Sequence, residues 1–432
     1  MKKLYLAPHK NIVMKIIHTS DWHLGHLLYK NERNDEFEYA LQQLVKITAL
    51  HQPDAMVVSG DIFDTPTPSA TAQQIFTKAL LQIHQSNTKM PIVIIAGNHD
   101  GKMFIDANKE LWKLANVFVV GLLERKMTNS EAVGTNIEIL ANKFNVDAQI
   151  IEIQNVGIIV AVPHIYDAGY PYLGNESADA KNRRKDYYHT LLDYVENHNK
   201  NHLPVVLMAH LAIAHCDTQG HDFDMIGGLE TSEMDEFGDF YDYLALGHIH
   251  KSQVFEYKKH IASYCGSLIP LSFSEEYPHG VQLVQVHHVM TTADIVPIEI
   301  KPLRKMLTLP SQPAAFKDAL KELDHIDDNE ECYIRLNVLA TDDFPSDAIA
   351  QVLTKLQSKK ARFCEFKLNN TDTIQTEIEK TMLEPSQLSQ LSAIEVANYY
   401  QKLKNNQELS EEHKAMFAEV LSRMNQNASI EK

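Results

Sequence analysis

The sequence predicts an α/β protein in which layers of β-sheet are flanked by helices. The chain has 432 residues, which is too long for a single hydrophobic core and indicates two or three domains. In its first half, short apolar runs alternate with segments of helical spacing, as in strands that alternate with helices. Residues 243–300 carry further short strands and few helical signals. We expect them to form a second sheet packed on the first.

Four apolar runs predict the strands of the first series. They lie at residues 14–18, 55–59, 92–96 and 205–209. Helical spacing between them predicts helices over 36–50 and 70–85. In the later series, the run at 280–286 reads as a strand. Residues 1–13 precede a second methionine, Met14, and we expect them to be a dispensable extension.

The pattern changes near residue 300 to that of a small independent α/β unit. Strands are predicted at 304–309, 333–339 and 363–368, and helices at 314–323 and 346–356. We therefore expect a first domain at 14–300, which carries the site described below, and a capping domain at 301–372. Residues 376–432 are polar and helical, and we interpret them as a partner-binding tail.

The tail is expected to hold two amphipathic helices. Their apolar residues are Leu388, Leu391, Tyr399, Tyr400 and Leu403 in the first, and Met416, Phe417, Val420, Leu421 and Met424 in the second. Spacing alone favours helices that pack on their own domain. Against this, the capping unit ends near residue 370 and leaves no strand layer in reach to cover them. That favours a groove in a partner protein.

Charge and composition narrow the function. A net charge of −17 argues against a free-standing binder of nucleic acid, but it allows a nuclease whose metal ions and partner supply positive charge. No apolar run reaches the ~20 residues that span a bilayer, and Pro8, His9 and Lys10 interrupt any signal-peptide core. The four cysteines lie far apart, as free thiols of a reducing compartment do. We expect a cytoplasmic protein without a membrane segment.

Five apolar runs end in a small residue that is followed by side chains able to bind a metal. They give Asp21 and His23 in SDWHLG, Asp61 and Asp64 in SGDIFD, Asn98, His99 and Asp100 in AGNHD, His210 in MAH, and His248 and His250 in LALGHIH. A polar turn, with Gly97 for backbone freedom, would explain one such motif. Five together indicate one crevice at the carboxyl ends of the strands.

The residue types specify the chemistry of this crevice. Carboxylates, an amide and histidines, without cysteine, exclude a structural thiolate zinc site and suit Mn²⁺, Fe²⁺ or Zn²⁺. Seven ligands are too many for one ion and fit two ions ~3.5–4 Å apart, the separation used for phosphate-ester chemistry. Such a pair needs a bridging ligand with two oxygens, for which Asp61 is the natural candidate.

The order D-x-H, G-D-x-x-D, G-N-H-D, H, G-H-x-H resembles the signature of the calcineurin-like metallophosphoesterases. Together with LALGHIHKSQ and GSLIPLSFSEE, it is similar to bacterial nuclease subunits of the SbcCD type, most strongly over residues 14–280. The resemblance implies a two-sheet sandwich and a metal-dependent DNA exonuclease and endonuclease with two ions, most often Mn²⁺. It also implies an SbcC-like ATPase partner and roles in DNA repair, recombination and replication.

The resemblance also assigns roles to the metal-site residues. It places Asp21, His23, Asp61 and His250 around one ion, and Asp61, Asn98, His210 and His248 around the other. It makes His99 the catalytic histidine, which stabilises the transition state or protonates the leaving oxygen. Asp100 is expected to orient a histidine.

Two positions depart from the family pattern. Some relatives have histidine where this chain has Asp64, so we expect Asp64 to act behind the ligands or in the loop. Residues 216–224 lack the expected polar run, so His215 and His221 are interpreted as loop histidines. Lys30, Arg33 and Lys251 are either phosphate contacts or solvated surface charges.

Two other functions compete with this interpretation. A phosphomonoesterase would need an arginine fork for its dianionic substrate. No arginine follows the ligand loops, although Lys102 lies two residues after Asp100. A non-catalytic scaffold would have lost ligands, and none is missing. The resemblance further implies a homodimer formed by helices near 69–85 and 101–115. Their apolar residues Ile75, Phe76, Leu80 and Leu81 face either a second copy of the chain or the protein's own core.

Overall fold

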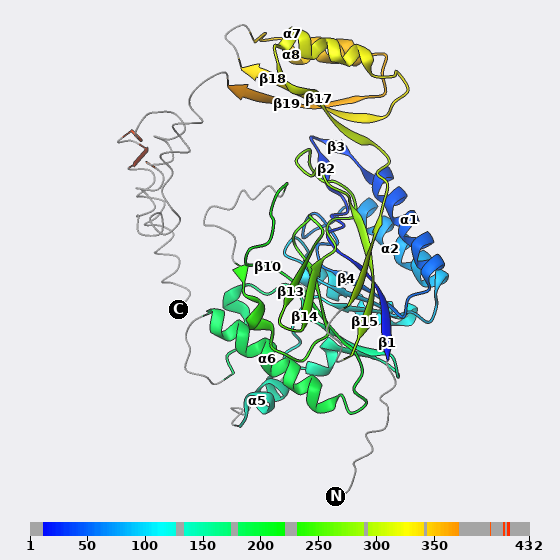
Figure 1. Ribbon diagram of the computed structural model, residues 1–432, viewed down its shortest axis with the longest axis vertical. Coiled ribbons are helices and arrows are strands. Elements are labelled where there is room, and N and C mark those ends of the chain that lie inside the picture. The colour runs from blue at the N-terminus through cyan, green and yellow to red at the C-terminus, as the bar shows by residue number, and fades with distance from the viewer. Residues whose placement is uncertain are drawn as a thin grey trace, which may run out of the picture.

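The computed structural model describes residues 12–126, 134–173, 180–220, 231–288, 293–340 and 344–370, together with a few single positions further on. Two six-stranded sheets pack face to face, and helices cover their outer faces (Figure 1). This arrangement confirms the predicted α/β class. Among the described residues, no helix combines the length and the apolar character that crossing a membrane requires.

The first sheet has the strand order β16-β15-β1-β4-β5-β6. Its strands are β1 (Val13–Thr19), β4 (Ala55–Ser59), β5 (Ile92–Ile95), β6 (Val117–Val120), β15 (Gly280–His287) and β16 (Asp294–Glu299). The strands β1, β4, β5 and β6 run parallel, and β15 pairs antiparallel to β1 with Ile16 opposite Val284. The expectation that all of 243–300 forms the second sheet is therefore wrong, because β15 and β16 complete the first.

The second sheet has the order β13-β14-β12-β9-β8-β7. Its strands are β7 (Ile150–Ile153), β8 (Gly157–Ala161), β9 (Val205–His210), β12 (Tyr243–Gly247), β13 (Gln253–Tyr257) and β14 (His260–Tyr264). The four inner strands are parallel, and the two outer strands pair antiparallel to their neighbours. The predicted strand at 205–209 belongs here as β9.

Side chains that alternate along the strands build the layers of the core. In β1, Ile17 faces the helices α1 (Asn34–His51) and α2 (Ala70–Ser86), whereas Ile16 faces the second sheet. Beyond the second sheet lie α5 (Asn136–Lys143) and α6 (Ala180–His198). Helix α6 was not among the predicted helices, and its tyrosines Tyr187 and Tyr188 are buried in the core beyond the second sheet.

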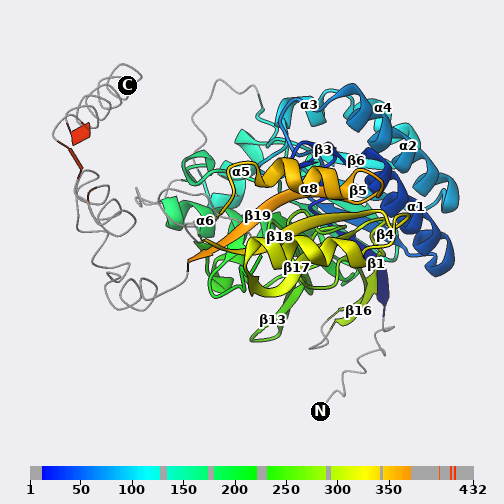
Figure 2. The same cartoon turned by 90° about the horizontal axis from the view of Figure 1, so that it is seen from above.

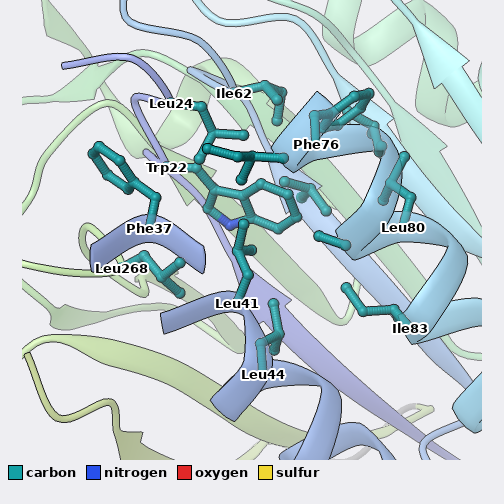
Figure 3. Packing of buried hydrophobic residues seen from close by; sticks show 14 of the residues in the cluster. Trp22, Leu24, Phe37, Leu41, Leu44, Ile62, Phe76, Leu80, Ile83 and Leu268 are labelled. Carbon is teal, nitrogen blue, oxygen red and sulfur yellow. The ribbon is translucent and has the colours of Figure 1, made fainter. Parts of the chain in front are cut away.

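Trp22 fastens the first ligand loop to the core (Figure 3). Its side chain is fully buried among residues of α1 and α2, and its indole N–H donates to Thr19 Oγ1 at 2.9 Å. The ring also meets Phe76 edge-on. Since Trp22 stands between Asp21 and His23, this burial fixes the backbone on both sides of it.

The proposed dimer face is largely internal. Ile75, Phe76 and Leu80 are buried between α2, α1 and the first sheet, so they belong to the protein's own core. Of the four named residues, Leu81 alone is exposed. Beyond it, α3 (Lys102–Asp106), α4 (Lys109–Trp112) and the turn at Lys113–Ala115 expose other apolar side chains, among them Leu114.

Residues 305–370 form a separate three-stranded parallel sheet with two helices on its outer face (Figures 1 and 2). Its elements are β17 (Lys305–Ala314), α7 (Phe316–Glu322), β18 (Cys332–Ala340), α8 (Ala348–Leu356) and β19 (Arg362–Asn370). The order of elements is as predicted, although β17 extends to the residue where the helix was expected to start. Phe316, Leu336 and Val352 belong to a core that this unit does not share with the two large sheets.

Buried polar contacts join this unit to the first domain. The hydroxyl of Tyr333 in β18 donates to Glu36 in α1, and Arg33 donates to the other oxygen of Glu36 at 2.9 Å. Arg304 donates to Asp35 at 2.9 Å, and its side chain is almost fully buried. These positive and negative side chains pair with one another at a buried place, where an unpaired charge would destabilise the fold. The expected extension at 1–13 and the two tail helices lie, apart from a few positions, outside the described residues.

Candidate metal centre

The carboxyl ends of five strands meet where the two sheets come together. In the first sheet, β1, β4 and β5 lead into the loops of Asp21, Asp61 and Asn98. In the second, β9 ends at His210 and β12 leads into His248, with Gly247 opposite His210 in the register. Strands from both sheets therefore deliver polar side chains to one place, as expected at the carboxyl ends of parallel strands.

Glycines allow the two sets of loops to approach each other. A Cβ on Gly247 would lie 1.9 Å from the carbonyl oxygen of Ser59, and one on Gly97 would lie 2.1 Å from Asp61 Oδ1. The backbone of Gly97 does not adopt a left-handed conformation. Gly97 is therefore needed for space, and the backbone freedom that a simple polar turn would ask of it is not used.

The structure brings the seven predicted ligands together. Their ligand atoms form two groups, each within 4.8 Å: Asp21, His23 and His250 in the first, and Asp61, His210 and His248 in the second. Asn98 belongs with the second group, because its Oδ1 lies 3.0 Å from His210 Nε2 and 3.0 Å from His248 Nδ1. A mixed set of carboxylate, amide and imidazole donors suits a divalent transition-metal ion.

Asp61 lies between the two groups. Its Oδ2 is 3.6 Å from His23 Nε2 in the first group and 3.2 Å from His210 Nε2 in the second. Its Oδ1 accepts the backbone N–H of His99 at 2.9 Å. The same oxygen of Asp61 therefore faces both groups, while the other oxygen is held by the backbone.

Four of these ligand residues have a backbone conformation that is rare outside glycine. The φ angles are 51° at Asp21, 44° at His23, 49° at Asp61 and 102° at His248. Such conformations cost on the order of 1–3 kcal/mol each and persist where the surrounding structure imposes them. Their concentration at one place indicates that the loops are held for a function rather than for stability.

The electrostatics of the centre favour cations. Both ring nitrogens of His23 are buried and have no hydrogen-bond partner among the described residues. Burial would lower the pKa of His23, but the carboxylates of Asp64, Asp61 and Asp21 raise it to about 9. Burial would also lower the pKa of His210, but the nearby Asp61 carboxylate raises it to about 9. Metal ions would replace these protons on the same nitrogens.

Hydrogen bonds behind the ligands select the ring nitrogen that points inward. His210 donates from Nδ1 to the carbonyl of Ser59 at 2.7 Å, which leaves Nε2 facing Asp61. His250 Nδ1 lies 2.9 Å from Glu275 Oε1. Burial lowers the pKa of His250 to about 3, so its single N–H is directed to Glu275 and the Nε2 lone pair is available to a metal. Such outer partners fix tautomer and ring orientation.

Asp100 has a different task from the expected one. Its carboxylate accepts the backbone N–H groups of Gly97 at 2.8 Å, Phe63 at 2.9 Å and Ile62 at 3.1 Å. The expectation that Asp100 orients a histidine is wrong. It ties the loop after β4 to the loop after β5 and so holds Asp61 in place.

His99 is the exposed histidine of the centre. Its Nδ1 donates to the carbonyl oxygen of Asp64 at 3.0 Å, which directs Nε2 elsewhere, and its ring meets His23 edge-on with centroids 4.8 Å apart. The Asp64 carboxylate lies 3.4 Å from His23 Nδ1 and 3.2 Å from His26 Nδ1. Asp64 thus contacts the histidines from behind. His23, Asp64 and His99 also form a third group of possible ligands.

Two further residues contact the centre without having been predicted from the sequence. Glu275 belongs to the quoted stretch GSLIPLSFSEE but was not connected to His250. His164 donates its backbone N–H to Ala96 O at 2.8 Å, and its ring N–H to His210 O at 3.0 Å. It follows the apolar strand β8, so the pattern of a strand followed by histidine, already used five times, would have found it.

Other predicted positions lie as follows. Arg33 is buried against Glu36 and the carbonyl of Pro270, so it is not a phosphate contact. Lys251 pairs with Asp217 in the loop after β10 (Ala212–Ile213). His215 lies in a turn of that loop, and His221 falls outside the described residues.

The contact between Glu275 and His250 makes a prediction about metal binding. Glu275→Gln should weaken Mn²⁺ binding at the group that contains His250, because the amide holds the Nδ1 proton of His250 less strongly. Loss of such an outer partner costs ~10–100-fold in metal affinity. Titration with Mn²⁺, following the free ion by electron paramagnetic resonance, measures each site. The neighbouring Glu276 has a side chain that is 76% exposed, so Glu276→Gln should bind as the wild type does. Equal weakening of both sites would contradict a role through His250.

Comparison with known proteins agrees with this geometry. The sequence model for "Calcineurin-like phosphoesterase" matches residues 14–252, more than half of the chain. Among curated proteins, the SbcD component of the nuclease SbcCD from Escherichia coli (strain K12) is 31% identical over 270 residues, 61% of this chain and 62% of that protein. The same-named protein of Rhodobacter capsulatus is 30% identical over 63% of this chain and 66% of that protein. That of Staphylococcus saprophyticus is 27% identical over 72% of this chain and 74% of that protein. The chain thus spans less than two thirds of the E. coli relative's length. It belongs to the calcineurin-like phosphoesterase family.

Proposed function

We propose that this protein hydrolyses DNA phosphodiesters at a centre of two divalent metal ions, as the nuclease component of a complex that processes DNA ends. The observation that carries the proposal is the pair of ligand groups joined by Asp61. Two ions bridged by one carboxylate are the arrangement used for in-line displacement at phosphorus. The relatives named as nuclease components support DNA as the substrate.

Mn²⁺ suits the donor set of the two groups, which mixes imidazole nitrogens with carboxylate and amide oxygens. When bound, the two ions would supply charge that stabilises the phosphate and would make a nearby water acidic enough to lose its proton near neutral pH. In this arrangement Asp61, fixed by the N–H of His99, contacts both groups. Glu275→Gln therefore tests the group that contains His250, and Asp61→Asn tests the contact shared by both groups.

We assign the proton transfer to His99. Its Nδ1–H is held by the Asp64 carbonyl, so Nε2 is the nitrogen that can reach a substrate at the exposed face. In its imidazolium form His99 carries a second proton on Nε2, and this proton passes to the leaving oxygen as the P–O bond breaks. The attacking water supplies the oxygen of the new phosphomonoester and loses its own proton to solvent. The products are a phosphomonoester and a free hydroxyl, the two ends of a cleaved strand.

Two substitutions separate coordination from proton transfer. Asp61→Asn should abolish Mn²⁺-dependent DNA cleavage and weaken both ions, because an amide bridges two cations poorly. His99→Ala should lower cleavage by ~10²–10⁴-fold, the usual contribution of a general acid, while both Mn²⁺ ions remain bound. Metal content by mass spectrometry and cleavage of labelled oligonucleotides give both readouts.

The same assays expose the alternatives. Loss of metal from the His99 variant would make His99 a ligand, as its grouping with His23 and Asp64 would allow. Wild-type protein that hydrolysed nucleoside monophosphates and left DNA intact would be a phosphomonoesterase. A protein with bound metal and no hydrolysis of either would be a scaffold.

We also propose an SbcC-like ATPase as partner and the reducing cytoplasm as compartment. With a net charge of −17, the chain needs a partner to supply much of its grip on DNA, and the relatives are named as subunits of a complex. All four cysteines are free thiols, as in reducing compartments.

The partner is tested by truncation. Removing the chain after residue 375 should leave Mn²⁺-dependent cleavage of short single-stranded DNA intact, because the metal centre lies within 14–300. Co-purification with the ATPase and ATP-dependent degradation of duplex ends should be lost. A truncated protein that bound the ATPase with full affinity would contradict a partner-binding role for the tail.

Finally, we propose that two copies pair through the outer side of α2 and α4. Most of the face predicted from the sequence is buried in the protein's own core, so we place the pairing at a neighbouring groove on the surface. This groove is lined by Leu81, His84, Asn108, Leu111, Trp112, Leu114 and Ala115. Leu111 and Leu114 are 66% and 86% exposed, and a patch of large apolar side chains on a surface commonly marks an interface.

Light scattering at micromolar concentration tests the pairing. Leu114→Glu should convert a dimer into a monomer, because it places a charge in the apolar groove. Leu50 in α1 is 77% exposed and lies outside the groove, so Leu50→Glu should remain dimeric. A wild-type protein that is monomeric throughout would remove the dimer from the proposal.

A further inference from the structure

An exposed tyrosine stands beside the metal centre without a role in the chemistry proposed above. Tyr166 follows β8, in the segment that carries His164, and 63% of its surface is exposed. The rings of His164 and Tyr166 meet edge-on with centroids 4.8 Å apart and planes at 87°. An aromatic ring that is held in a fixed orientation and is open to solvent can stack on a flat ligand.

Contacts with two ligand loops fix the position of His164. Its backbone N–H donates to the carbonyl of Ala96, two residues before Asn98. Its Nδ1–H donates to the carbonyl of His210 at 3.0 Å, and the rings of these two histidines lie 6.1 Å apart. The orientation of Tyr166 is thereby tied to the side of the centre that holds Asn98 and His210.

A lysine completes the surface around the ring. The ammonium of Lys102, three residues after His99, lies 5.0 Å from the centroid of the Tyr166 ring. No carboxylate pairs with Lys102 among the described residues, whereas Lys109 in the next helix pairs with Glu124 and Asp106. The ammonium of Lys102 is therefore available to bind an anion. Its cation–π contact also helps to hold the Tyr166 ring in place.

We infer that Tyr166 stacks an unpaired nucleobase next to the scissile phosphate, while Lys102 contacts that phosphate. The inference rests on the proposed nuclease function and deepens it. Aromatic platforms beside cationic side chains are how proteins hold single strands without regard to sequence, since each base offers a flat face. A base within a duplex is stacked on both faces and has to leave the stack before it can reach such a ring. The site thus selects single-stranded or locally opened DNA.

Two small diesters with the same leaving group separate base stacking from chemistry. Thymidine 5′-(p-nitrophenyl phosphate) carries a base, and methyl p-nitrophenyl phosphate does not. The measurement is the ratio of kcat/KM for the thymidine ester to kcat/KM for the methyl ester, with the full-length protein and Mn²⁺. Tyr166→Ala should lower this ratio about tenfold, within the range found when a stacking aromatic is truncated. Tyr166→Phe, which keeps the ring, should preserve it.

Tyr172 provides a matched control. It lies in the same segment and is 50% exposed, and the described contacts include none between its ring and the metal centre, so Tyr172→Ala should keep the wild-type ratio. An unchanged ratio in Tyr166→Ala, or an equal loss for both esters, would overturn the inference. Lys102→Met should lower kcat/KM for both esters, which share the phosphate, and wild-type rates in that variant would remove Lys102 from the site.

The test of base stacking by Tyr166 does not depend on whether DNA is the substrate. Wild-type protein that hydrolysed both esters and left DNA intact would refute DNA as the substrate. The ratio measured with Tyr166→Ala would still decide whether this tyrosine binds a base.

Discussion

The Asp61 carboxylate is the contact on which the metal centre depends. It is buried where the two sheets meet, and a buried carboxylate is costly unless it is compensated. Compensation comes from the N–H of His99 on one oxygen and from His23 and His210 on the other. Each of these partners belongs to a different strand end. The position of Asp61 therefore holds only if both sheets keep their register.

The surrounding layers supply the rigidity that this arrangement requires. Asp21, His23, Asp61 and His248 have left-handed backbone conformations, which isolated loops would leave. Trp22 prevents this in the first loop by filling the core under α1 and α2. In the next two loops, Asp100 does so by accepting three backbone N–H groups. The strain of the ligand loops is thus balanced by packing and hydrogen bonds that have no part in the chemistry.

One segment links the capping unit to the metal centre. Residues 267–279 run between them, and the unit contacts this segment through Arg335, which donates to Phe273 O at 3.2 Å and stacks on its ring. Arg33 holds the same segment at Pro270 O. Two residues beyond Phe273, Glu275 accepts the backbone N–H of Leu271 and holds His250. The orientation of His250 and the position of the capping unit therefore depend on the same short stretch of chain.

The sequence by itself determined the class of the fold, the strands that lead to the candidate metal centre, and the identity of the seven residues that come together there. It did so because strand and ligand signals are local: an apolar run, a small residue and a polar side chain stand next to each other in the chain. The comparisons with known proteins confirm the family that these motifs resemble.

Tertiary structure decided what depends on residues far apart in the chain. That β15 pairs with β1, that Gly97 is needed for space, that Asp100 binds backbone and that Arg33 is buried all follow from contacts across more than one element. The apolar face of α2 is a further example. Apolar spacing predicts that Ile75 and Leu80 are buried, but it does not say whether they are buried against α1 or against a second copy of the chain. Local pattern fixes which side chains a segment presents, and only packing fixes what each of them meets.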